Sequence, residues 1–72
     1  MASEREYLEK MSTKQLDALL FQELLGGEQM RLAVIYLTCE ILARREPKRG
    51  TAKDIFLEFA ARYADNKGLR WI

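Results

Sequence analysis

The sequence contains no histidine and only one cysteine, Cys39. A single cysteine cannot form an intrachain disulfide, and a structural zinc site needs several Cys or His ligands. Histidine is also the most frequent general base near neutral pH. These absences argue against a metal site, against a disulfide framework and against an enzyme.

Glycine-rich phosphate loops and β-strand patterns are also missing. Gly26 and Gly27 lie between two apolar segments, without the lysine or the spacing of a P-loop. We therefore predict no cofactor. The chain has no alternating apolar–polar run, no Asn-Gly turn and no internal repeat. An all-α fold is expected, and 72 residues suffice for a single helical domain, 1–72.

The sequence has no apolar run long enough to cross a bilayer, since segment 30–43 is too short for a transmembrane helix. No membrane partner is therefore predicted. A free cysteine without a secretory leader favours a reducing, cytoplasmic setting. Cys39 lies among apolar neighbours, so we expect a buried and unreactive thiol.

What the chain does contain is a segment, 30–43, that is apolar on nearly every side of a helix. The residues that surround the helix axis are Leu32, Val34, Ile35, Leu37, Ile41 and Leu42. Such a helix must be enclosed by other elements. We predict a central helix at about 28–45, with Leu37 and Ile41 fully buried, wrapped by the rest of the chain and by a second copy.

Capping patterns define the remaining helices. The pairs Ser3/Glu6, Ser12/Gln15 and Thr51/Asp54 each place an N-cap residue three positions before an acidic or amide side chain. They predict helices at 4–11, 13–25 and 52–67, and the sequence leaves open whether 4–25 is one helix or two. The predicted fold is a small bundle of three to four helices.

Charge is distributed unevenly along the chain. Residues 1–43 carry four basic and seven acidic residues, a net charge of −3, whereas residues 44–72 carry eight basic and four acidic residues, a net charge of +4. This asymmetry indicates an acidic partner or self-association of unlike halves. It also identifies a basic segment, 44–53.

Two functions are compatible with these features. We favour a non-enzymatic protein-interaction or regulatory module that self-associates as a homodimer, partly because the apolar end of the chain carries interface-prone residue types. The alternative is a nucleic-acid-binding regulator that resembles a helix-turn-helix and uses segment 44–53. The sequence leaves open whether Trp71 belongs to the core or to an interface. The candidate partner-binding residues are Arg44, Arg45, Lys48, Arg49, Lys53, Arg70, Trp71 and Ile72.

Overall fold

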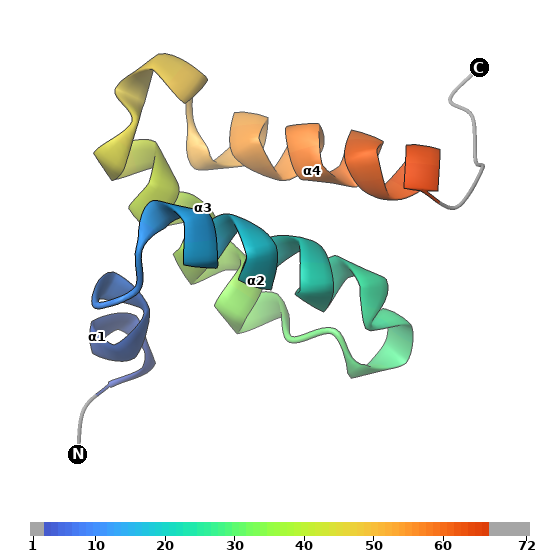
Figure 1. Cartoon of the computed structure of the whole chain (residues 1–72), viewed down its shortest axis with the longest axis horizontal. Helices are drawn as coiled ribbons and strands as arrows, with labels where there is room; N and C mark the ends of the chain where they lie inside the picture. Colours follow the sequence, from blue (N-terminus) through green and yellow to red (C-terminus); the bar gives the residue numbers. More distant parts are fainter. Residues whose placement is uncertain (1–2, 67–72) are drawn as a thin grey trace.

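The computed structural model describes residues 3–66 and contains four α-helices and two 3-10 turns within them (Figure 1). The elements are α1 (Glu4–Glu9), α2 (Thr13–Leu25), η1 (Gly27–Gln29), α3 (Leu32–Arg45), η2 (Pro47–Arg49) and α4 (Ala52–Asn66). This part of the chain has no strand, so the all-α prediction is confirmed. None of its helices combines the length and the apolar character that crossing a bilayer requires.

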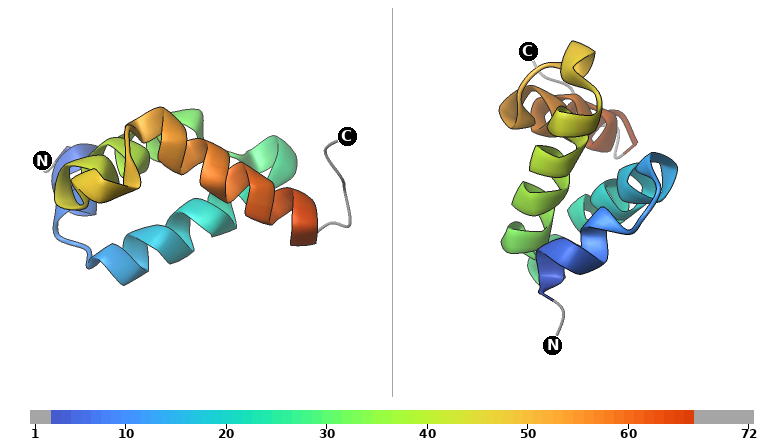
Figure 2. Two further views of the ribbon diagram at one scale, coloured as in Figure 1. Left: turned by 90° about the horizontal axis from the view of Figure 1, so that it is seen from above. Right: turned by 90° about the vertical axis from the view of Figure 1, so that its left-hand side faces the viewer.

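Helix α3 is the centre of the arrangement and packs against α1, α2 and α4. In the right-hand view of Figure 2, α1 and α2 lie on one side of α3 while α4 crosses near its upper end. The other side of α3 has no helix over it in this view. The shared core consists of Leu8, Leu16, Leu20, Leu24, Ile35, Cys39, Ile41, Leu42, Ile55 and Phe59.

Helices α1 and α2 are separate, which answers the question that the sequence left open. Ser12 has an extended backbone, with φ −70° and ψ 160°, and caps α2. Its hydroxyl accepts the amide N–H of Gln15 and the Gln15 side chain accepts the N–H of Ser12, so the capping box is complete. Helix α1 ends at Glu9, two residues before the predicted end.

The central helix begins at Leu32, four residues after its predicted start at about residue 28. Gly27 has a φ of 58°, and the chain then forms a 3-10 turn and an extended connection before α3. The Glu23 carboxylate accepts the backbone N–H of Arg31 at 3.0 Å and pairs with its guanidinium at 2.7 Å. These bonds, of which the side-chain pairing is the larger cause, lower the pKa of Glu23. They hold Arg31 outside the helix.

The corner between α3 and α4 is fixed by Gly50 and by the cap of α4. Gly50 has a φ of 99°, and a Cβ at this position would lie 2.5 Å from Oδ2 of Asp54. That oxygen accepts the backbone N–H of Thr51 at 2.9 Å, and the Thr51 hydroxyl accepts the N–H of Asp54 at 3.3 Å. The predicted capping box is confirmed, and the predicted helix end at residue 67 lies outside the described residues.

Burial of the central helix differs from the prediction at one position. Ile41 is buried as expected, but Leu37 is only partly buried at the edge of the core. Thr38, one residue further along, is fully buried. Each residue turns the helix by about 100°, so the neighbouring helices determine which apolar side chains of α3 are enclosed.

The difference between Ile41 and Leu37 can be measured. We expect Ile41→Ala to lower the free energy of unfolding by about 2–5 kcal/mol, because it leaves a cavity in the core. Leu37→Ala should cost clearly less, because water already reaches that side chain. Urea unfolding followed by circular dichroism measures both values. Equal losses would contradict the burial described here.

Candidate functional site

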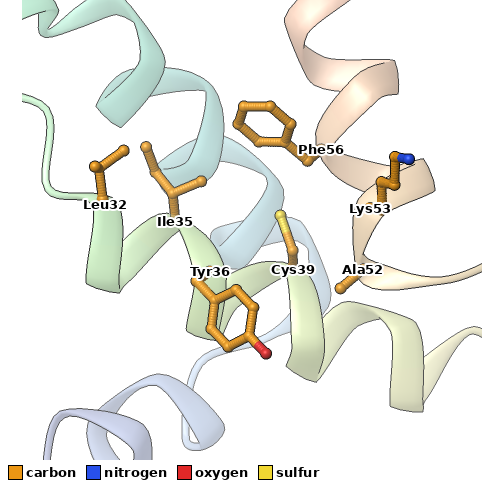
Figure 3. A pocket seen from close by; sticks show the side chains of 7 residues that line it. All are labelled: Leu32, Ile35, Tyr36, Cys39, Ala52, Lys53 and Phe56. Atoms are coloured by element: carbon orange, nitrogen blue, oxygen red, sulfur yellow. The ribbon is translucent and has the colours of Figure 1, made fainter.

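An apolar groove of about 380 Å³ lies between α3 and α4 (Figure 3). Its lining residues are Leu32, Ile35, Tyr36 and Cys39 from α3, and Ala52, Lys53 and Phe56 from α4. In Figure 3, the Phe56 ring reaches from α4 toward the α3 side of the groove. The corner fixed by Gly50 connects the two helices that form these walls.

Several large side chains of the groove are exposed to solvent. Leu32 is 68% exposed, Tyr36 is 61% exposed and Phe56 is 37% exposed, whereas Ile35 and Cys39 are buried. Leu32 and Tyr36 are four residues apart and therefore lie on the same face of α3. The groove thus has a buried apolar floor and an exposed apolar rim, on a side of the central helix that the other helices leave open.

The polar side-chain groups of the groove are the thiol of Cys39, the hydroxyl of Tyr36 and the amine of Lys53. Burial raises the pKa of the Cys39 thiol to about 11, so the thiol is protonated at neutral pH and is a poor nucleophile. Lys53 is the charged side chain of the lining. Among residues 3–66, no three His, Cys, Asp or Glu side chains lie close enough together to hold a metal ion. The chemistry available is the binding of apolar groups.

Two of the candidate partner-binding arginines bind other parts of the chain. Arg45 donates hydrogen bonds of 2.7 Å to the backbone carbonyls of Glu9 and Met11 and so binds the C-terminal end of α1. Arg49 donates to Asp17 at 3.2 Å and to Glu58 at 2.9 Å. It thereby connects η2 with α2 and α4.

Arg49 is also held by its surroundings. Its side chain is 19% exposed, and its guanidinium lies 5.7 Å from the centre of the Phe59 ring. Burial acts to lower the pKa of Arg49, but the hydrogen bonds to Glu58 and Asp17 outweigh it and raise the pKa. The guanidinium therefore remains charged and paired within the fold.

The other basic candidates described by the structure have no contacts like those of Arg45 and Arg49. Arg44, Lys48 and Lys53 are exposed, and none of them has an ion-pair partner within the part of the chain that the structure describes. Of these three, Lys53 lines the groove. The candidates Arg70, Trp71 and Ile72 lie outside the described residues.

Sequence reasoning named Lys53 but not the apolar residues that form the groove with it. Leu32 was assigned to the enclosed central helix, and Phe56 falls in the helix predicted at 52–67. The signal that pointed to them was the surplus of apolar surface around segment 30–43. Which part of that surface stays exposed depends on where α1, α2 and α4 pack.

Comparison of the chain with protein-family models, with curated proteins and with solved structures gives no significant match.

The intramolecular contacts of Arg49 lead to a testable difference between neighbouring basic residues. We expect Arg49→Ala to lower the free energy of unfolding by about 1–2 kcal/mol, because it breaks partly buried ion pairs to two helices. Lys48→Ala is the matched control and should change stability by less than about 0.5 kcal/mol. Urea unfolding of both variants at one salt concentration makes the comparison. Identical stabilities would show that the Arg49 contacts contribute nothing.

Proposed function

We propose that this protein is a non-enzymatic association module that binds protein through the α3–α4 groove and self-associates as a two-fold homodimer. The observation that carries the proposal is the exposure of Leu32 and Tyr36 on the central helix, beside Phe56 of α4. Large apolar side chains gathered at one concave place on a small protein are typical of an interaction site.

The composition of the groove suits a protein partner. Tyr36 and Phe56 are aromatic, and aromatic residues supply much of the binding energy at the centre of interfaces. Lys53 adds a charge beside them and can contribute to orientation. A second copy is always available as a partner, and closed two-fold dimers are the commonest oligomers.

The absence of enzymatic activity is part of this proposal. The groove brings together a protonated thiol, a phenol and an ammonium group, without a carboxylate among its lining residues. This set offers no base to activate a nucleophile at neutral pH.

Nucleic-acid binding is the second candidate, and one observation favours it. Arg44, Lys48 and Lys53 are exposed near the corner between α3 and α4. The exposed acids Asp54 and Glu58 on α4 would repel phosphates. Because Arg45 and Arg49 are occupied within the fold, fewer cations of segment 44–53 are available than the sequence suggested.

Sedimentation equilibrium over a wide concentration range tests self-association. We expect the parent protein to form a dimer and Tyr36→Glu to be monomeric, because the substitution places a charge on the apolar rim of the groove. Tyr7→Glu is the matched control, since Tyr7 is 68% exposed on α1 and lies outside the groove. A parent protein that stays monomeric at every concentration would refute the proposed self-association.

Titration of fluorescent duplex and single-stranded nucleic acid at low salt tests the second candidate. If the protein binds nucleic acid, replacing Arg44, Lys48 and Lys53 together by alanine should weaken this binding. The plot of log affinity against log salt concentration should also become less steep, by about one unit of slope per lost phosphate contact. This triple variant leaves Arg49 and its ion pairs in place. Absence of binding by the parent protein would remove the second candidate.

A further inference from the structure

We propose that the α3–α4 groove of one copy receives Trp71 from the C-terminal segment of a second copy, and that the exchange is reciprocal. This inference rests on the self-association proposed above and names the group that fills the groove. It concerns residues 67–72, which follow the described part of α4 and have the sequence KGLRWI.

The size of the exposed apolar surface supports a contribution from this segment. Leu32, Tyr36 and Phe56, with the neighbouring Leu57, which is 52% exposed, offer on the order of 400 Å² of apolar side chain. A stable protein interface buries about 800 Å² per partner. The exposed apolar side chains of the groove therefore account for about half of that area, and other groups of the chain have to supply the rest.

The C-terminal segment contains apolar groups of the appropriate kind. Leu69, Trp71 and Ile72 are apolar, and Trp71 is the only tryptophan of the protein. An indole ring that enters a groove with aromatic walls is a frequent centre of binding energy. Arg70 would lie near Lys53, but repulsion between exposed charges is screened by solvent and is weak compared with the burial of an indole ring.

Chain length favours the C-terminal segment of a second copy over the protein's own segment. Phe56 lies ten residues before Asn66 on α4, which corresponds to about 15 Å along the helix axis. The five residues from Asn66 to Trp71 reach about 17 Å when fully extended. Returning along α4 also requires a reversal of the chain, which uses about four residues. The backbone that remains is shorter than the ~15 Å back to Phe56, which favours the groove of a second copy.

The test uses disulfide cross-linking between two different chains in a Cys39→Ala background. One chain carries Lys53→Cys at the rim of the groove, and the other carries Ile72→Cys next to Trp71 and a heavy-isotope label. The chains are mixed and mildly oxidised, and intact-mass spectrometry counts the mixed disulfides. Gln22→Cys, at an exposed position of α2, replaces Lys53→Cys in the matched control.

We expect the 53–72 disulfide to form at least several-fold more than the 22–72 control. Fluorescence gives a second readout on the unmodified protein: the emission of Trp71 should shift to shorter wavelength as concentration rises, and this shift should be absent in Tyr36→Glu. The fluorescence result does not depend on how well the cysteine variants fold.

Three results would overturn the inference, and they can be told apart. If the parent sediments as a dimer but the 53–72 link does not exceed the control, the C-terminal segment lies elsewhere and the proposed function stands. If one chain carrying both Lys53→Cys and Ile72→Cys forms mainly a monomeric disulfide, the groove holds its own segment. If the parent is monomeric, the proposed self-association fails together with the inference.

Discussion

The constraint on which this structure depends is a central helix that is apolar around almost its whole circumference. In a chain of 72 residues, few elements are available to cover it. Helices α1, α2 and α4 each contact α3, and they enclose Ile35, Ile41 and Leu42. Leu32 and Tyr36 stay in solvent, because three helices around one axis leave part of its surface open.

Polar contacts also connect the three covering helices with α3 and with one another. Arg45, at the end of α3, binds the carbonyl groups at the end of α1. Arg5 of α1 pairs with Glu40 of α3 at 3.0 Å, and Arg49 joins Asp17 of α2 to Glu58 of α4. Such ion pairs add little stability when exposed, but they join residues far apart in the sequence. They therefore favour one arrangement among several that would bury similar apolar area.

Local features of the fold could be predicted from the sequence, whereas features set by packing could not. The capping pairs at Ser12 and Thr51 act over three residues, so their pattern sufficed to locate the starts of α2 and α4. The start of α3 depends on Glu23, eight residues before Arg31, and no local pattern reveals that pairing. The groove depends in the same way on the crossing of α3 and α4. The basic candidates were recognised by charge, which does not distinguish the paired Arg49 from the exposed Lys48.

The exposed face of α3 is apolar because it carries Leu32 and Tyr36. A polar residue at an exposed helix position usually changes the stability of a monomer by less than about 0.5 kcal/mol. The fold of a single copy therefore does not require apolar side chains at Leu32 and Tyr36, which are more than half exposed. Their apolar surface is favourable only when something removes it from water. The proposed association thus rests on the same property of α3 that forms the core, namely that its apolar surface exceeds what the helices within residues 3–66 cover.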